Sequence, residues 1–194
     1  DADMAQAYLN RLWYATGRHD YQNETWFSLY AGPLTPGTDV VSDNLYSRWN
    51  RNGTNVRNDA GWNETTDWGL FDNFIDIRRA NIAIEKLEAG CGFGKILEDD
   101  MLGQAYFAKG LIYATRAKSF GGYPIIEKTL TVDDELSLSR ASIKETFDYA
   151  IRLLEKAAPL LNISSPSGRP NRGAAYALLS EVYLNAAAYI KYAV

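Results

Sequence analysis

The side chains best suited to binding chemistry are concentrated between residues 47 and 68, where tryptophans stand among amide and charged residues. The flat apolar face of an indole ring can cover the C–H face of a sugar ring, and polar groups beside it can satisfy the sugar hydroxyls. This stretch supplies both kinds of group and almost no aliphatic side chain. Together with one aspartate just before it, it yields our candidate ligand-binding residues: Trp62, Trp49, Trp68, Asn63, Arg57 and Asp43.

The same tryptophans also have a purely structural interpretation. A segment with so few aliphatic side chains needs an apolar group to fasten it to the rest of the domain, and an indole ring would serve. Trp68, at the predicted start of a helix, suits this structural role well, whereas for Trp62 both interpretations stay open. We expect Trp13 and Trp26 to lie in the core.

No group of residues in the sequence predicts catalysis. His19 is the only histidine, and no nucleophile stands near it in a familiar arrangement. Acidic clusters at residues 98–100 and 133–135 could supply a glycosidase carboxylate pair, but their positions suit helix capping or an acidic loop better. The glycine-rich run at residues 90–95 misses the phosphate-loop spacing by one residue. We therefore expect no catalytic residue, no metal and no cofactor.

Composition narrows the classes of partner. The 194 residues are 46% hydrophobic and 23% charged, with a net charge of −4, which is the balance of an ordinary globular domain. No basic patch suited to nucleic acid or to an anionic membrane stands out. Cys91 is the only cysteine, so no disulfide can form within the chain. No apolar run reaches the roughly 18 residues that a membrane-spanning helix needs.

Apolar spacing and stop residues predict a chain that is almost entirely helical. The predicted helices cover residues 3–16, 68–89, 98–119, 142–161 and 171 onward. Ser142 followed by Glu145 is a capping box, the clearest of the helix starts. Small residues in the third helix would let neighbouring helices approach closely. The fold class is therefore all-α, with tetratricopeptide-like antiparallel helix pairs and a long irregular loop between the first two helices.

Periodicity also predicts which residues face the core. In the second helix the expected apolar face includes Phe74, Ile75, Ile77, Ile82, Ile84 and Leu87. In the last helix it comprises Ala175, Leu178, Leu179, Val182, Tyr183 and Ala186. Between the third and fourth helices, residues 123–132 are expected to be short and extended.

Four sequence blocks resemble one family. Residues 103–126 are similar to its A-x-F-x-[KR]-x-x-x-Y helix followed by F-G-x-x-P, through Ala105, Phe107, Lys109, Tyr113, Phe120, Gly121 and Pro124. Residues 71–87, 139–161 and 168–187 match three further blocks in the right order. The family is the SusD/RagB family of Bacteroidetes outer-membrane nutrient-binding lipoproteins.

This resemblance implies a non-catalytic, surface-exposed lipoprotein of the outer membrane, which binds oligosaccharide or another nutrient and delivers it to a TonB-dependent transporter. Its lipid anchor is absent from this chain, and residues 1–194 would be a single domain that lacks the family's C-terminal half. The segment between the first two helices would contribute to the glycan site. Two alternatives remain: a helical-repeat module that docks a protein partner without binding glycan, and, less favoured, a glycan-active enzyme.

Overall fold

A computed structural model describes residues 1–16, 74–134 and 137–192, and these residues form α-helices and loops without a β-strand. The chain divides into two compact units, one made of residues 1–13 and 74–194 and the other of residues 14–73. The second unit lies almost entirely outside the described residues. The all-α prediction is confirmed, while the prediction of a single domain stays a prediction.

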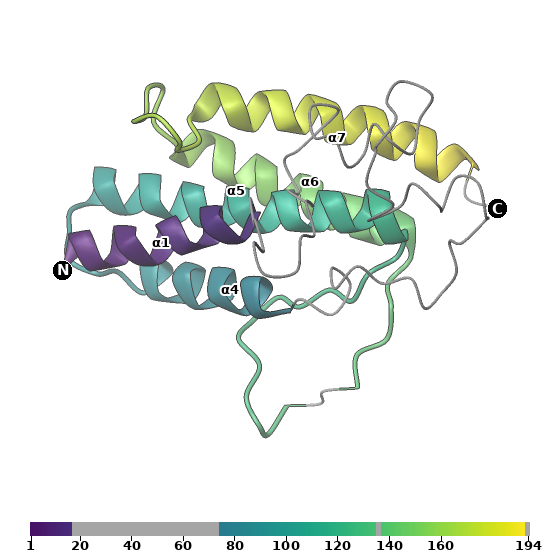
Figure 1. The fold of residues 1–194 in the computed structure, drawn as a ribbon, viewed down its shortest axis with the longest axis horizontal. Coiled ribbons are helices and arrows are strands. Elements are labelled where there is room, and N and C mark those ends of the chain that lie inside the picture. Colours follow the sequence, from purple (N-terminus) through teal and green to yellow (C-terminus); the bar gives the residue numbers. More distant parts are fainter. Residues whose placement is uncertain (17–73, 135–136, 193–194) are drawn as a thin grey trace, which may run out of the picture. The chain divides into compact units, whose positions relative to one another are not determined.

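The first unit is built from helices that follow one another in alternating directions (Figure 1). They are α1 (Ala2–Thr16), α4 (Ile75–Glu88), α5 (Lys95–Phe120), α6 (Ile143–Leu160) and α7 (Arg172–Tyr192). Helix α5 packs against both α4 and α6, and α7 packs mainly against α6. Helix α1 reaches α5 through a hydrogen bond of 3.2 Å from Gln6 Nε2 to Gln104 Oε1. The antiparallel neighbours predicted from the sequence are therefore present.

Close packing of α5 on α6 depends on two glycines. A Cβ atom at Gly103 would lie 2.9 Å from Leu161 Cγ, and one at Gly110 would lie 2.8 Å from Leu154 Cγ. Both distances are shorter than carbon atoms tolerate, so the helices approach each other only because these positions carry no side chain. The prediction that small residues in this helix allow close approach is confirmed.

The starts of α6 and α5 differ in how far the local sequence determines them. At α6, Ser142 Oγ accepts from the Glu145 N–H at 3.1 Å and the Glu145 carboxylate accepts from the Ser142 N–H at 2.8 Å, as the capping box predicts. Helix α5 begins at Lys95, three residues earlier than predicted. Its first turn is stabilised by Glu98, whose carboxylate accepts from the N–H groups of Cys91 and Phe93.

Two residues predicted to face the core are exposed, and both predictions are wrong. The side chain of Ile75, at the first turn of α4, is 59% exposed, and Phe74 before it is the N-cap of the helix. Tyr183 on α7 is 48% exposed, and its hydroxyl donates to Glu155 Oε1 of α6 at 2.8 Å. The other predicted residues of α7 are buried, apart from the half-buried Leu178.

None of the helices in the described ranges is both long enough and apolar enough to cross a bilayer.

Candidate functional site

The six candidate ligand-binding residues lie outside the described residues: Trp62, Trp49, Trp68, Asn63, Arg57 and Asp43. Their grouping into one site therefore stays a prediction. Trp26 also lies there, and the side chain of Trp13 is not described. What the structure does show is the polar framework of the first unit, which sequence reasoning did not anticipate.

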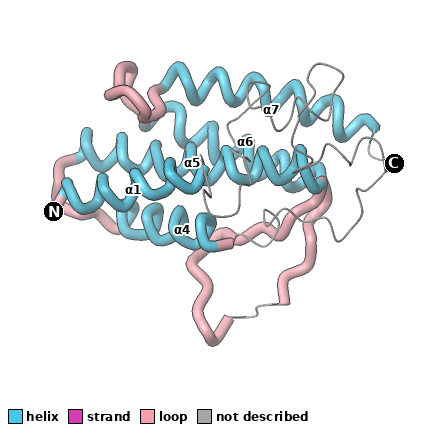
Figure 2. Tube along the Cα trace, in the orientation of Figure 1, coloured by secondary structure: helices cyan, strands magenta, loops and turns pink. Residues whose placement is uncertain are grey.

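This framework surrounds an extended segment, residues 122–130, that we call the strap. It follows α5 and runs toward α4 before the chain turns outward into an exposed loop (Figure 2). No described strand pairs with the strap, yet its buried backbone groups still require hydrogen-bond partners. Side chains from three helices supply them.

Helix α4 binds the second half of the strap through three residues on one helical face. Asn81 Nδ2 donates to the carbonyl oxygens of residues 126 and 128, at 3.3 and 2.7 Å. The N–H of Thr129 donates to Glu85 Oε1 at 2.6 Å. Arg78 donates to the carbonyl oxygen of Leu130. The spacing of residues 78, 81 and 85 aligns them along the helix, so α4 takes the place of a neighbouring strand.

Helix α5 binds the middle of the strap through Tyr113 and Lys109. The Tyr113 hydroxyl accepts from the Ile126 N–H at 2.8 Å and donates to the Pro124 carbonyl at 3.1 Å. One turn earlier, Lys109 Nζ donates to the Glu127 carbonyl at 3.4 Å. Burial raises the pKa of the Tyr113 hydroxyl well above its ordinary value, so it remains a neutral donor and acceptor.

The start of the strap is held by α6 and by Arg140, two residues before the N-cap of α6. The Tyr123 N–H donates to Thr146 Oγ1 at 3.0 Å. Arg140 donates to the carbonyl oxygens of Gly122 and Phe120, at 2.9 and 2.7 Å. Arg140 therefore ties the return of the exposed loop to the end of α5, and both ends of that loop have defined positions.

Cations stacked on tyrosines line the α5–α6 contact beside the strap. The Lys109 ammonium lies 5.2 Å from the centre of the Tyr149 ring, and the Arg152 guanidinium lies 5.4 Å from it. Farther along, Lys156 lies 5.2 Å from the Tyr106 ring, whose hydroxyl donates to Glu88. Such contacts stabilise a cation that is partly removed from water.

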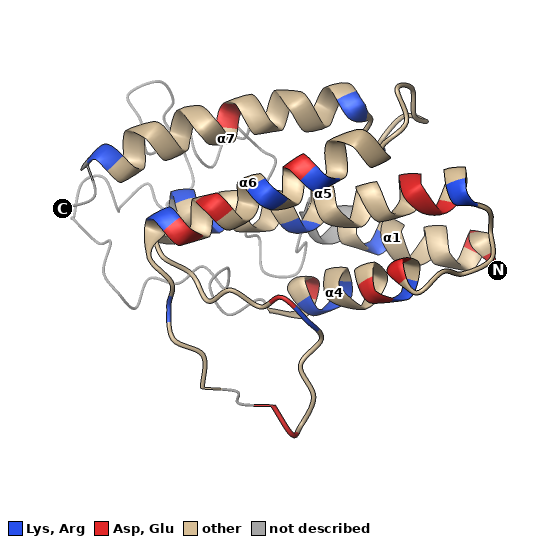
Figure 3. Ribbon diagram, turned by 180° about the vertical axis from the view of Figure 1, so that it is seen from behind, with Lys and Arg blue, Asp and Glu red and all other residues tan. Residues whose placement is uncertain are grey.

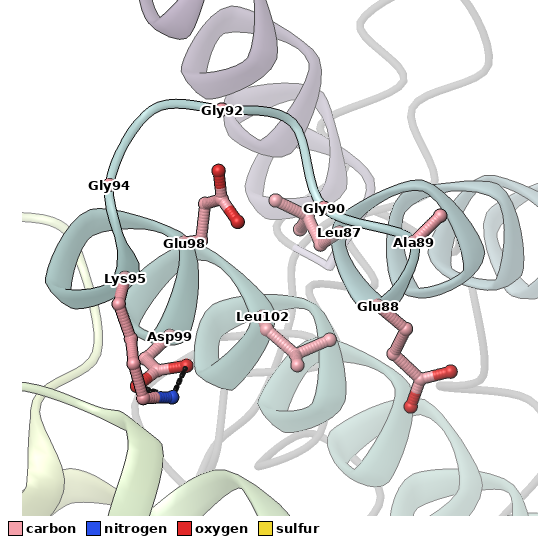
Figure 4. A pocket seen from close by; sticks show the side chains of 10 residues that line it. All are labelled: Leu87, Glu88, Ala89, Gly90, Gly92, Gly94, Lys95, Glu98, Asp99 and Leu102. Atoms are coloured by element: carbon pink, nitrogen blue, oxygen red, sulfur yellow. Dashed lines mark hydrogen bonds and ion pairs between the residues drawn. The ribbon is translucent and has the colours of Figure 1, made fainter.

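A hollow lies where α4 turns into α5 (Figure 4). It is lined by the glycine-rich turn and by Leu87, Glu88, Lys95, Glu98, Asp99 and Leu102, and Lys95 pairs with Asp99 at 2.9 Å. None of the described residues that line it is aromatic, so these residues offer no platform for a sugar ring. No group of three or more metal-binding side chains occurs in the described ranges.

One sequence signal could have revealed the strap framework. Asn81, Lys109 and Arg116 are polar residues set among apolar ones on faces that helical periodicity assigns to the core, and each is at most 2% exposed. Buried polar groups need partners. The segment expected to be extended, residues 123–132, was a natural source of those partners, because no predicted helix satisfies its backbone groups.

A family model described as "Starch-binding associating with outer membrane", of the SusD-like class, matches residues 34–184. The chain belongs to this SusD-like family. The match includes the predicted ligand-binding stretch as well as helices α4 to α6 and most of α7. No curated protein sequence matches the chain.

Solved structures show the same fold. Surface glycan-binding protein A from Bacteroides uniformis superposes with a TM-score of 0.77 at 16% identity, over 98% of this chain and 44% of that one. The protein of the same description from Bacteroides fluxus gives 0.74 at 20% identity, over 94% and 39%. A laminarin-binding SusD-like protein gives 0.55 at 25% identity, over 60% and 25%. This chain thus spans less than half the length of each of these relatives.

Proposed function

We propose that the chain is part of a surface protein that binds oligosaccharide without altering it and delivers it to a TonB-dependent transporter in the outer membrane. The observation that carries the proposal is the family match, because it extends across the tryptophan-rich stretch and its description names starch binding and the outer membrane. Two of the similar structures are called surface glycan-binding proteins, and a third is called laminarin-binding.

The chemistry of residues 43–68 supports a sugar ligand. Trp62 and Trp49 are the proposed platforms for sugar rings, and Trp68 extends them. Asn63, Arg57 and Asp43 are the proposed partners of the hydroxyl groups. The described residues that line the hollow between α4 and α5 include no aromatic side chain, so they favour this stretch over the hollow as the glycan site.

The first experiment is a titration of the chain with starch-type and laminarin-type oligosaccharides, followed by calorimetry and by tryptophan fluorescence. We expect saturable binding, and Trp62→Ala should weaken it about tenfold or more, equivalent to about 1.4 kcal/mol. Trp62→Phe retains an aromatic face and should lose less. Tyr176→Ala, which removes an exposed aromatic ring from α7, is the matched control and should leave the affinity unchanged.

Three results would contradict the proposal in different ways. Unchanged affinity in Trp62→Ala would move the ligand site away from this stretch. Equal weakening in Trp62→Ala and Tyr176→Ala would indicate a nonspecific response to lost aromatic surface. Release of shorter sugars during the titration, measured by chromatography, would show an enzyme and exclude a purely binding role.

Docking of a protein partner is a second candidate function, and α7 is the observation that favours it. Large apolar side chains are exposed on its outer side: Tyr176 is 58% exposed, Tyr183 48% and Leu184 73%. A helix that is apolar on both sides is typical of one packed on both sides. Leu184→Asp should abolish binding to the transporter while leaving oligosaccharide affinity intact, whereas Trp62→Ala should do the reverse.

A further inference from the structure

Lys109 is an unusual residue of α5, because its ammonium group is buried beneath the strap. The residue is only 1% exposed. Within the described part of the chain its Nζ makes one hydrogen bond, to the Glu127 carbonyl at 3.4 Å, and one stacking contact, with the Tyr149 ring. An ammonium carries three N–H donors and is strongly hydrated in water. When the strap is closed, the Lys109 ammonium has therefore lost its hydration water, and it has gained only one long hydrogen bond and one stacking contact in return.

The charged and titratable groups around Lys109 come from every neighbouring element. Helix α4 contributes Glu85 and Glu88, α5 contributes the Tyr106 and Tyr113 hydroxyls, α6 contributes Arg152, Lys156 and Tyr149, and the strap contributes Glu127. The three glutamates are exposed to solvent, which screens their attraction for the ammonium. Burial is the largest influence, and it lowers the pKa of Lys109 to about 8.

Opening of the strap would return this ammonium to water. The strap covers Lys109 through the Glu127 backbone, and the neighbouring bonds from Tyr113 and Asn81 hold the same short segment in place. We infer that Lys109 is a proton-linked latch: the strap is held less firmly when Lys109 carries its proton and more firmly when Lys109 is neutral. Neither the proposed ligand-binding residues nor oligosaccharide is needed for this behaviour.

The direction of the pH dependence follows from linkage. The closed state lowers the pKa of Lys109 to about 8, below the value near 10.5 of a hydrated lysine. Between these values the open state binds more protons, so the closed state is favoured as the pH rises. The cost of the buried charge is fully present below the lower value. If opening fully hydrates the ammonium, the opening equilibrium should fall about tenfold between pH 7 and pH 9.

Amide hydrogen exchange measured by NMR tests the latch. The N–H groups of Ile126 and Thr129 bond across the closed strap, so their protection factors, corrected for intrinsic exchange, report its opening. We expect protection to rise about tenfold from pH 7 to pH 9 in the wild-type chain. Lys109→Met should remove this rise. Lys86→Met, which removes an exposed lysine from α4, should retain it, and the amide of Leu154 in α6 reports global opening separately.

Two results would overturn the inference. One is a rise in strap protection of the same size in Lys109→Met as in the wild type. The other comes from a direct titration of the wild-type chain labelled with 13C-lysine, which remains decisive if Lys109→Met does not fold. We expect the Lys109 Cε resonance to titrate near pH 8, and a midpoint above pH 10 would show that the closed strap does not disfavour the charge.

Discussion

Helix α5 buries polar residues, whereas helix α7 exposes apolar ones. Helix α5 buries Gln104, Lys109 and Arg116, each at most 2% exposed, whereas α7 exposes Tyr176 and Leu184. The difference lies in their neighbours: α5 has α4, α6 and the strap around it, and α7 packs mainly against α6. Figure 3 shows that charged residues on α7 occur only near its two ends and at one place between them. Lys109 donates to the Glu127 carbonyl of the strap, and Gln104 donates to Asp100, so buried polar groups of α5 find partners within the first unit. The exposed apolar side chains of α7 have no described cover there.

The largest effect is expected from a pair of glycine substitutions, one in the strap and one in α7. A Cβ atom at Gly122 would lie 1.9 Å from the Ala141 carbonyl oxygen, which is backbone and cannot move aside. Gly122→Ala should therefore destabilise the fold by about 3 kcal/mol or more. At Gly173 the nearest atom is the Asn171 side-chain oxygen at 3.3 Å, so Gly173→Ala should change stability by less than about 0.5 kcal/mol. Urea denaturation measures both, and a small loss in Gly122→Ala would show that the strap can shift.

The two sides of α7 provide the next comparison. Leu179 is 8% exposed and faces the other helices, and Leu184 is 73% exposed. Leu179→Ala should cost about 2.5 kcal/mol because it leaves a cavity in the core. Leu184→Ala should cost less than about 0.5 kcal/mol. Equal losses in thermal or urea unfolding would mean that the outer side of α7 is covered by another part of the protein.

A smaller difference is expected between two tyrosine hydroxyls. Tyr113→Phe leaves the Ile126 N–H and the Pro124 carbonyl without their buried partner, which should cost about 1.5 kcal/mol. Tyr183→Phe removes only an exposed hydrogen bond to Glu155 and should be nearly neutral. The measurement is urea unfolding, with amide exchange at Ile126 as a local readout. Similar costs for the two variants would mean that the strap contributes no more than a surface contact.

The smallest effect concerns the turn that follows the strap, where Asp134 accepts from Lys128 and from the backbone and hydroxyl of Thr131. The Lys128 hydrogen bond and then the Thr131 bonds lower the pKa of Asp134 to about 2. Because the folded value is depressed, this turn should be intact above the ordinary aspartate pKa and lost as the pH falls toward 2. NMR titration of the Asp134 carboxyl carbon measures this, and a midpoint near 3.8, its ordinary value, would show that the turn does not persist in solution.

Sequence patterns predicted those features of the fold that depend on local signals. Ser142 and Glu145 determine the start of α6 within four residues, and glycines at 103 and 110 indicate close helix contacts. Patterns failed where the outcome depends on distant neighbours. Helix α7 is apolar on all sides, so periodicity could not place Tyr183 outside and Leu179 inside. The burial of Lys109 and Asn81 depends on strap residues up to 47 positions away, for which no local pattern exists.

The site was predicted by composition and by family resemblance rather than by geometry. The family match shows family membership. Residues such as Trp62 and Asn63 follow no periodic pattern, so the sequence does not predict where their side chains lie relative to each other. The strap framework, in contrast, was missed because polar residues on a helix are usually solvent-exposed.

The most direct test of this division between framework and site is hydrogen–deuterium exchange with and without a bound oligosaccharide. The ligand would be the starch-type or laminarin-type sugar that gives saturable binding in the titration. We predict that saturation slows exchange in peptides covering residues 43–68 and leaves the strap and the exposed side of α7 unchanged. Slowed exchange confined to α7 or to the strap, with none in residues 43–68, would contradict the proposed glycan site.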